Sequence, residues 1–392
     1  LNAMSFDKSA GLFPALNEKT FLAHCSISPM FSPAADRAIE LIREQQFKGV
    51  TTFGDYYLQE LSELKKHAGH LLRTSPDNIA SVRNTSEALS IIANGYPFEA
   101  GDEVISYVHE YPANYYPWRL QERRGVRLKL LSDVPARGDL PSGLPGSWSM
   151  EELELLITDR TRVIALSHVQ FTSGYAADLR ALGDLCRRHD IDLIIDAAQS
   201  LGSMPIYPEA FNIAALASAG WKWLMGPFGT GIFYISEALR EKVALTQVGA
   251  ETMQQGMDFL DHSWNPHSTA RRFEYSSSPV TLVAALATCL REVHARYGAD
   301  AIFEEILRLQ DHFLEHLAHP DLKPLRFSRK HRSGILALYC PDLKGCAAAL
   351  STQDLICSPR GGYLRVAPHY YNTEEQVEQL AAALNRSGSG NP

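Results

Sequence analysis

Residues 162–196 read RVIALSHVQFTSGYAADLRALGDLCRRHDIDLIID and contain the pattern that decides the fold. Residues 162–167 and 192–196 are short apolar runs with β-branched side chains, which predicts two buried strands. Between them, residues 178–190 place leucines three residues apart on one face of an amphipathic helix. A strand, a helix and a second strand in this order predict a parallel pair covered by the connecting helix.

The same alternation continues on both sides of this unit. Residues 103–107 and 127–131 are further strand-like runs, and residues 231–235 form another one downstream. Because buried parallel strands are covered by helices on both faces, the rhythm predicts an α/β fold with a mostly parallel sheet.

Near Ser276 the alternation of strand-like and helical segments gives way to two long helical patterns, at residues 279–297 and 300–317. Shorter strands and helices then follow to about residue 385. We therefore predict a large α/β domain over residues 20–275. A smaller α+β domain is expected over residues 276–386, joined by the N-terminal segment 4–19.

The composition limits the classes of function. The chain has 392 residues, of which 45% are hydrophobic and 21% charged, with a net charge of −8. Such a chain is globular, and its acidic balance disfavours a broad nucleic-acid surface. Its six cysteines form no CxxC pair, no run of about 18 apolar residues occurs, and no signal peptide precedes the first strand. We expect a cytoplasmic protein without a membrane segment.

Both ends of the chain differ from the rest. Leu1, Asn2 and Ala3 precede Met4 and are interpreted as the remnant of a tag, and residues 387–392 (SGSGNP) are expected to be a disordered tail.

Two segments around the strand 192–196 carry chemistry. Asp196 ends the strand, where ligands bind in open parallel sheets, although an isolated Asp at this place is more often a helix or turn cap. Lys222 lies between two tryptophans in the uncharged run LASAGWKWLMGPFGTG. Desolvation would lower its pKa and favour the neutral amine that Schiff-base chemistry needs. A lysine that extends out of an apolar patch is an equally good interpretation of Lys222 alone.

A third segment, residues 81–90 (SVRNTSEALS), runs from a short strand into a helical pattern. Hydroxyls and free N–H groups at the start of a helix suit a phosphate, but for this segment alone an ordinary N-cap box is the better interpretation.

Taken together, the three segments resemble the class V aminotransferases, pyridoxal-phosphate enzymes of fold type I related to cysteine desulfurases, isopenicillin-N epimerase and kynureninase. The resemblance rests on the strand-ending Asp196, on Gln199, on Lys222 in its KWL-GP-GTG context and on NTSEAL upstream. It implies a seven-stranded, mostly parallel sheet in the large domain, and pyridoxal 5'-phosphate as the cofactor.

The resemblance also implies a role for each of these residues. Lys222 would form the Schiff base and move the proton at the substrate α-carbon. Asp196 would face the pyridine nitrogen and Gln199 the ring hydroxyl. Thr85 and Ser86 would hold the phosphate. Further cofactor contacts are expected from Ser218, four residues before the lysine, and from Trp221.

Other stretches extend the resemblance to the substrate. In residues 108–118 (VHEYPANYYPW), Tyr111 takes the place of the residue that stacks on the cofactor ring, whereas the neighbouring Tyr116 is expected to pack in the core. In PRGGYLRVAPHYYNT, Arg365 takes the place of the arginine that binds the substrate carboxylate. Phe171 is expected to line the side-chain pocket.

Residues 272–279 (RFEYSSSP) resemble the stretch that reaches the cofactor phosphate of a neighbouring subunit. Ser278, with Ser277 as the alternative, would make this contact. The resemblance therefore implies a homodimer with shared active sites.

The reaction is less constrained than the cofactor. Cysteine desulfurases carry a loop cysteine ahead of the carboxylate-binding arginine, and here Cys357 precedes Arg365 by eight residues, with a short loop between them. We interpret Cys357 as structural and expect aminotransferase-like handling of an amino acid. A cysteine desulfurase, a C–S lyase or an amino-acid epimerase on the same fold remains the alternative. A Rossmann dehydrogenase is excluded because no GxGxxG follows the first strand.

Overall fold

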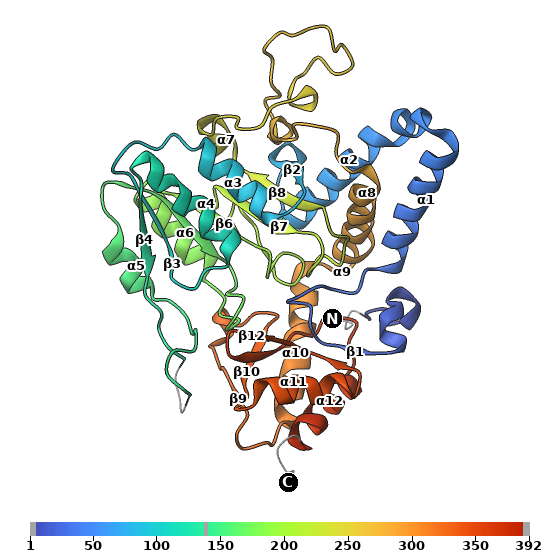
Figure 1. The fold of residues 1–392 in the computed structure, drawn as a ribbon, viewed down its shortest axis with the longest axis vertical. Coiled ribbons are helices and arrows are strands. Elements are labelled where there is room, and N and C mark those ends of the chain that lie inside the picture. The colour runs from blue at the N-terminus through green and yellow to red at the C-terminus, as the bar shows by residue number, and fades with distance from the viewer. Residues whose placement is uncertain (1–4, 137–139, 387–392) are drawn as a thin grey trace.

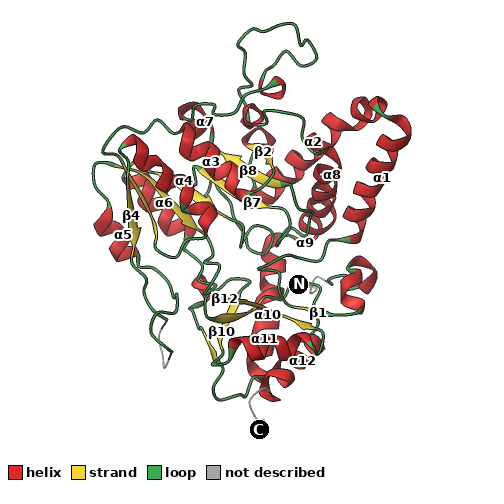
Figure 2. Cartoon of the chain, in the orientation of Figure 1, coloured by secondary structure: helices red, strands yellow, loops and turns green. Residues whose placement is uncertain are grey.

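A computed structural model describes residues 5–136 and 140–386 of the chain (Figure 1). The expected tag remnant at Leu1–Ala3 and the expected tail at residues 387–392 lie outside the described residues. Strands occupy the centre of the larger part of the molecule, with helices around them (Figure 2).

The central sheet has seven strands, and neighbouring strands are parallel except where they pair with β8. Only β8 runs against the others, because it is antiparallel to both β7 and β2. The predicted seven-stranded, mostly parallel sheet is therefore confirmed. In spatial order the strands are β2 (Ile79–Val82), β8 (Gly231–Ile235), β7 (Ala215–Ala219), β6 (Asp192–Asp196), β5 (Thr161–Ser167), β3 (Glu103–Tyr107) and β4 (Arg127–Leu131).

Both faces of the inner strands are buried, which explains why these strands are mostly apolar, whereas the edge strand β4 carries Arg127 and Lys129 and is only partly buried. Along β6, Leu193 and Ile195 belong to one hydrophobic cluster, while Ile194 belongs to the cluster on the opposite face. This follows from the alternation of side chains along a strand. The helices of the larger part are α1 (Ser32–Lys48), α2 (Val50–Leu72), α3 (Thr85–Gly95), α4 (Tyr116–Arg119), α5 (Met150–Leu156), α6 (Leu179–Arg188), α7 (Glu237–Lys242) and α8 (Val280–Cys289).

The structure differs from the sequence-based expectations at one helix and at one tyrosine. The predicted helix over residues 279–297 is divided into α8, a π-helical turn at Leu290–His294 and α9 (Ala295–Tyr297). The expectation that Tyr116 packs in the core is wrong, because its side chain is 64% exposed on α4, whereas the nearby Trp118 is fully buried.

The C-terminal part forms a second, smaller layer of sheet and helices. Its four-stranded antiparallel sheet has the order β12 (Ser358–Arg360), β13 (Tyr363–Val366), β10 (Leu336–Tyr339) and β9 (Lys323–Pro324). The helices of this part are α10 (Ala299–His316), α11 (Leu343–Ser351) and α12 (Glu374–Arg386). A short parallel pair, β1 (Thr20–Phe21) with β11 (Leu355–Ile356), lies beside it.

The N-terminal segment returns to this smaller part. Phe13 packs on Tyr371 with ring centroids 4.3 Å apart, and Lys8 pairs with Glu305 at 2.8 Å. The domain boundary near residue 276 stays a prediction. The helix that follows it, α8, packs against α1 and α2 and shares Leu286 with the core of the large sheet.

Across the described residues, no helix combines the length and apolar character needed to cross a membrane.

Candidate active site

A cavity of about 370 Å³ opens at the carboxyl ends of β5, β6 and β7, beside the start of α3. The strand register explains why its walls converge, because Asp196 pairs with Ser167 of β5 and with Ala217 of β7. The lining residues are Asn84, Thr85, Ser86, Tyr111, Ala113, Ser167, Val169, Phe171, Asp196, Ala198, Gln199, Ala219, Trp221 and Lys222. Eight of the residues predicted from the sequence are among them.

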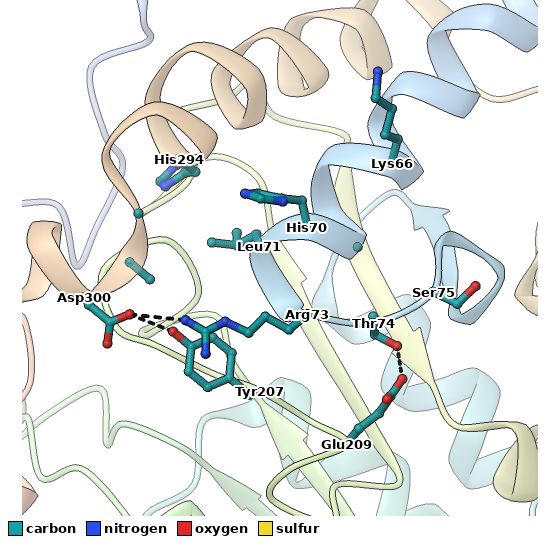
Figure 3. A pocket seen from close by; sticks show the side chains of 13 residues that line it. Lys66, His70, Leu71, Arg73, Thr74, Ser75, Tyr207, Glu209, His294 and Asp300 are labelled. Carbon is teal, nitrogen blue, oxygen red and sulfur yellow. Dashed lines mark hydrogen bonds and ion pairs between the residues drawn. The ribbon is translucent and has the colours of Figure 1, made fainter.

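A larger hollow of about 710 Å³ lies elsewhere, between the end of α2 and the start of α10 (Figure 3). Two of its charged side chains, Arg73 and Asp300, already pair with each other. Arg73 lies 3.7 Å from Asp300 and stacks on the ring of Tyr207, whose hydroxyl donates to Asp300 at 2.7 Å. None of the residues predicted for the site lines this hollow. The cavity around Lys222 is therefore the candidate active site.

Lys222 projects from the turn that follows β7. Its Nζ lies 5.5 Å from the centre of the Tyr111 ring, and among the described residues no carboxylate lies within the 4 Å of an ion pair. Burial lowers the pKa of Lys222, while the charge of Asp196 acts in the opposite direction. The wall thus holds a basic amine that is poorly solvated and unpaired, which is the state of a nucleophilic lysine.

Asp196 is 4% exposed at the end of β6. Burial raises the pKa of its carboxyl. Two effects lower this pKa: the backbone N–H of Ala198 donates to Oδ1 at 2.9 Å, and Lys222 carries a positive charge nearby. Because one hydrogen bond and a nearby charge offset only part of the cost of burying this carboxylate, a cationic partner in the cavity would stabilise it.

Gln199 lines the same wall, but much of its amide already has partners. Its Nε2 donates to the backbone oxygen of Cys25 at 2.9 Å, and its Oε1 accepts from the Trp223 indole at 3.2 Å. One N–H of the amide remains for a ligand in the cavity.

The start of α3 forms another part of the cavity wall. Asn84 is its N-cap, with a side chain that accepts from the backbone N–H of Glu87 at 2.9 Å. Thr85 is buried, and its hydroxyl has no hydrogen-bond partner. Because buried hydroxyls in proteins are nearly always paired, this one indicates a missing acceptor, and Ser86 beside it lines the cavity too. A phosphate at a helix start would supply it.

Aromatic rings complete the cavity. Tyr111 and Phe171 meet edge to face with centroids 5.2 Å apart, and Trp221 packs on Phe228 with centroids 5.0 Å apart. Tyr111 is 45% exposed, so its ring face is accessible to a planar ligand.

Arg365 lies behind the Phe171 wall and is 2% exposed. Its Nη1 donates to the backbone oxygen of Phe171 at 2.6 Å, and its Nη2 donates to the Ser358 hydroxyl at 2.6 Å. Burial lowers the pKa of the guanidinium, and no carboxylate of the described residues pairs with it. A buried, unpaired cation beside the cavity suits an anionic ligand.

Three residues predicted as cofactor contacts do not line this cavity. Ser218 lies in β7 and its hydroxyl donates to the backbone oxygen of Ala219 at 3.2 Å. Ala219, the next residue along the strand, lines the cavity instead. Ser277 and Ser278 lie in the stretch before α8, where the backbone N–H of Ser278 donates to the Tyr57 hydroxyl at 2.8 Å.

Sequence reasoning missed Glu110, which is buried directly beneath the cavity. It accepts hydrogen bonds from the backbone N–H of Ser167 at 2.7 Å and from Nε2 of Gln170 at 3.2 Å. Burial raises the pKa of this carboxyl to about 7. Glu110 precedes Tyr111 in a segment rich in tyrosine, and nothing in that pattern showed that it turns inward.

A group of buried histidines behind the Lys222 turn was missed as well. His24 and His369 lie with ring centroids 4.7 Å apart, and each lies within 6 Å of the Trp223 ring. His294, from the π-helical turn, packs closely on Gly202. A Cβ at Gly202 would lie only 3.0 Å from the His294 ring and 2.5 Å from the Trp223 carbonyl oxygen. Burial lowers the pKa of His24 to about 3 and that of His294 to about 4. These neutral rings form the packing surface on which the lysine turn rests.

Cys357 has the environment of a structural thiol. It joins β11 to β12, packs against the core of the C-terminal part, and burial raises the pKa of its thiol. The segment between Cys357 and Arg365 is a tight hairpin of β12 and β13. A raised pKa opposes the thiolate form that a nucleophilic cysteine needs.

These features fit pyridoxal 5'-phosphate: an unpaired lysine, a buried carboxylate, an unpartnered hydroxyl at a helix start and an accessible aromatic face. The start of α3, Asp196, Lys222 and Tyr111 all line the same cavity.

Comparison with known proteins agrees with it. The family model of class-V aminotransferases matches residues 39–380. Among curated proteins, the chain is 24% identical over 375 residues to an uncharacterized aminotransferase, YcbU, of Bacillus subtilis, covering 95% of this chain and 96% of the relative. It is 27% identical over 365 residues to a cysteine desulfurase of Salmonella typhimurium, covering 86% and 85%.

Solved structures show the same fold. The cystine C–S lyase C-DES, in complex with its reaction product cysteine persulfide, superposes with a TM-score of 0.86 at 21% identity, covering 95% of this chain and 99% of the other. The cysteine desulfurase of Thermococcus onnurineus superposes with a TM-score of 0.82 at 20% identity, covering 99% of each chain.

Proposed function

The chain belongs to the class-V aminotransferase family and is a pyridoxal-phosphate-dependent enzyme, and we propose that Lys222 is the residue that binds its cofactor covalently. One observation carries the proposal. Lys222 is the amine that lines the cavity, and it shares the cavity with Asp196 and with the unpartnered hydroxyl of Thr85.

The surrounding residues divide the work of holding the cofactor. Thr85, Ser86 and the free N–H groups of α3 would bind its phosphate. Asp196 would accept a hydrogen bond from the ring nitrogen, and its charge would keep that nitrogen protonated. Gln199 would reach the ring hydroxyl with its remaining N–H, and the faces of Tyr111 and Trp221 would enclose the ring. The cofactor supplies an electron sink for negative charge at the substrate α-carbon.

Lys222 would also move the proton at the α-carbon. Burial favours its neutral amine, and a neutral Nζ can accept a proton where a cationic one cannot. Arg365 would hold the carboxylate of the amino acid, which orients the α-carbon toward Nζ. Phe171 and Tyr111 would exclude water from the exposed side.

The homodimer belongs to this proposal too. Ser277 and Ser278 do not line the cavity of their own chain, so a cofactor contact from either serine would have to be made in a neighbouring subunit.

For the reaction, we propose aminotransferase-like handling of an amino acid. A second candidate, C–S cleavage of a cysteine derivative without a protein persulfide, is favoured by the C-DES relative together with the position of Cys357. A buried thiol at the base of a tight hairpin is a poor persulfide carrier, but C–S lyase chemistry does not require one.

The test combines labelling with product analysis. Borohydride reduction of the purified protein, followed by peptide mass spectrometry, should find the cofactor on Lys222 and nowhere else. A panel of amino acids, including cystine, is then assayed for keto acid, ammonia, sulfane sulfur and racemised amino acid. Keto acid formed only with an added amino-group acceptor supports transamination. Ammonia and sulfane sulfur from cystine support the lyase. A label on another lysine would refute the assignment of Lys222.

A further inference from the structure

Two histidines and a glutamate converge where α10 ends against α12, far along the chain from Lys222. His312 Nε2 lies 2.7 Å from an Oε atom of Glu378, and His316 Nε2 lies 3.9 Å from the same atom. One ligand atom from each of the three residues falls within 4.8 Å of the other two. We propose that His312, His316 and Glu378 bind a divalent transition-metal ion.

The spacing of the histidines is suited to chelation. Residues four apart on a helix lie on the same face, one above the other. The two imidazoles have ring centroids 4.5 Å apart and planes inclined by 42°. Both rings project from α10 toward the Glu378 side of α12, so the chelating pair needs no rearrangement of the backbone.

The hydrogen bond of His316 fixes which of its nitrogens can bind a metal. Its Nδ1 lies 2.9 Å from the backbone oxygen of His312. Because a carbonyl only accepts, Nδ1 must carry the proton, and Nε2 presents its lone pair toward Glu378. Metal-binding histidines commonly donate their other N–H to a backbone carbonyl in this way.

The charges around the cluster also favour a cation. His316 is the last residue of α10, where the helix dipole is negative. The only ion-pair partners of Glu378 among the described residues are the two histidines, while the nearby Glu374 is paired with Arg308. The carboxylate of Glu378 therefore has no permanent cation of its own.

The distances are close to those of a bound ion. With metal–ligand bonds of about 2.0–2.2 Å, tetrahedral geometry separates ligand atoms by about 3.3–3.6 Å. The observed 2.7 Å and 3.9 Å lie on either side of this range. A small rotation of the half-exposed Glu378 side chain away from His312 and toward His316 would bring both distances closer to this range. Two imidazoles and one carboxylate select Zn²⁺, Ni²⁺, Cu²⁺ or Co²⁺ over Mg²⁺ or Ca²⁺.

A bound ion would link two helices of the C-terminal part. Without metal, α10 and α12 are joined at this point by the hydrogen bond between His312 and Glu378. A metal ion replaces that hydrogen bond with three coordinate bonds and adds its binding free energy to the folded state. The ion would thus stabilise the packing of α12 on α10.

The test uses tag-free, full-length holoenzyme that has been treated with a chelator and dialysed. Zn²⁺ is titrated by calorimetry, and Co²⁺ is followed by its visible d–d bands, which report tetrahedral coordination. We expect one Zn²⁺ per chain and a rise in melting temperature. His316→Ala and Glu378→Gln should each weaken binding by about 100-fold or more. His189→Ala and Glu315→Gln, which change exposed groups outside the cluster, should leave the affinity unchanged.

Each outcome decides the question. Equal affinity of His316→Ala and the parent protein would overturn the site, as would binding that appears only at millimolar metal. If Glu378→Gln bound Zn²⁺ as tightly as the parent while His316→Ala did not, the three-ligand site would be wrong, because the histidine pair alone would explain the binding. Melting curves of the metal-free variants verify that each one is folded before it is titrated.

Discussion

Replacement of Arg365 by Ala should selectively remove the recognition of a substrate carboxylate. A guanidinium has five N–H donors. Three of them are used inside the protein: Nε donates to the Ser358 carbonyl, Nη2 to the Ser358 hydroxyl and Nη1 to the Phe171 carbonyl. One N–H therefore remains on each Nη atom. Two parallel donors of this kind match the two oxygens of a carboxylate.

The size of the effect follows from those two donors. A hydrogen bond to a charged group contributes about 1.5–3 kcal/mol, so two contribute about 3–6 kcal/mol. At about 1.4 kcal/mol per factor of ten, kcat/KM for an amino acid should fall by about 10²–10⁴ in Arg365→Ala. Most of the loss should be in KM, because the carboxylate is held in the ground state and the transition state alike.

The assay must separate carboxylate binding from damage to the wall, because Arg365 also holds Phe171 in place. We would compare each amino acid with the amine that lacks its carboxylate, by following the change in cofactor absorbance on binding. The preference for the amino acid should collapse in Arg365→Ala. Ser358→Ala is the matched control, since it removes one internal partner of the guanidinium but leaves its two free donors.

Equal losses for the amino acid and for the amine would refute the reasoning. In that case Arg365 would support the cavity wall, and the carboxylate would be bound elsewhere. Arg365→Lys gives a second test, because lysine keeps the charge but lacks the paired donors. This variant should retain only part of the preference for the amino acid over the amine.

Four further predictions concern the other groups of the site. Lys222→Ala should leave no borohydride-fixed cofactor and slow α-proton exchange by at least about 10²-fold; unchanged exchange would contradict its role. Asp196→Asn should keep the cofactor but slow the same exchange, and full activity would exclude the charge argument. Cys357→Ala should keep kcat within about twofold, and loss of sulfur release from cysteine would revive a persulfide mechanism. Glu110, with its pKa raised to about 7, keeps a proton that the unfolded chain releases near pH 4.5. The free energy of unfolding should therefore fall by up to about 3 kcal/mol between these pH values, and melting temperatures at pH 5–8 should show a smaller fall in Glu110→Gln than in the parent.

The strands of the central sheet could be predicted because they are buried on both faces. The run 192–196 is apolar at every interior position and the run 103–107 at all but Ser106, and the structure has strands with these bounds. The reversed direction of β8 could not be predicted. A buried strand has the same apolar pattern in either direction, and only the path of the chain through the Lys222 turn sets its sense.

The cavity residues could be predicted where a short segment carries them. Asp196 and Lys222 stood out from their sequence context, and the resemblance to the family joined them with Gln199 in one site, which the cavity lining agrees with. Ser218 shows the limit of spacing. Successive side chains of a strand point to opposite faces, and in β7 it is Ala219 that faces the cavity.

The buried histidines mark a different limit. His24 and His369 are 345 positions apart, and each is an isolated histidine in an apolar context. Their contact with Trp223 depends on the N-terminal segment returning to the C-terminal part. Long-range packing of this kind leaves no periodic trace in the sequence.

The hairpin before Arg365 connects substrate recognition to the choice of reaction. Gly361 and Gly362 both have positive φ, at 57° and 87°, and a Cβ on Gly361 would lie 2.6 Å from the Thr172 side chain. The turn is therefore pressed against the residue that follows Phe171, and within the same hairpin Arg365 lies opposite Ser358 in the strand register. A longer loop that could carry a cysteine to the cavity would remove the contact. The same tight turn that orients the carboxylate-binding arginine thus keeps Cys357 at the base of the hairpin, which argues for chemistry at Lys222 alone.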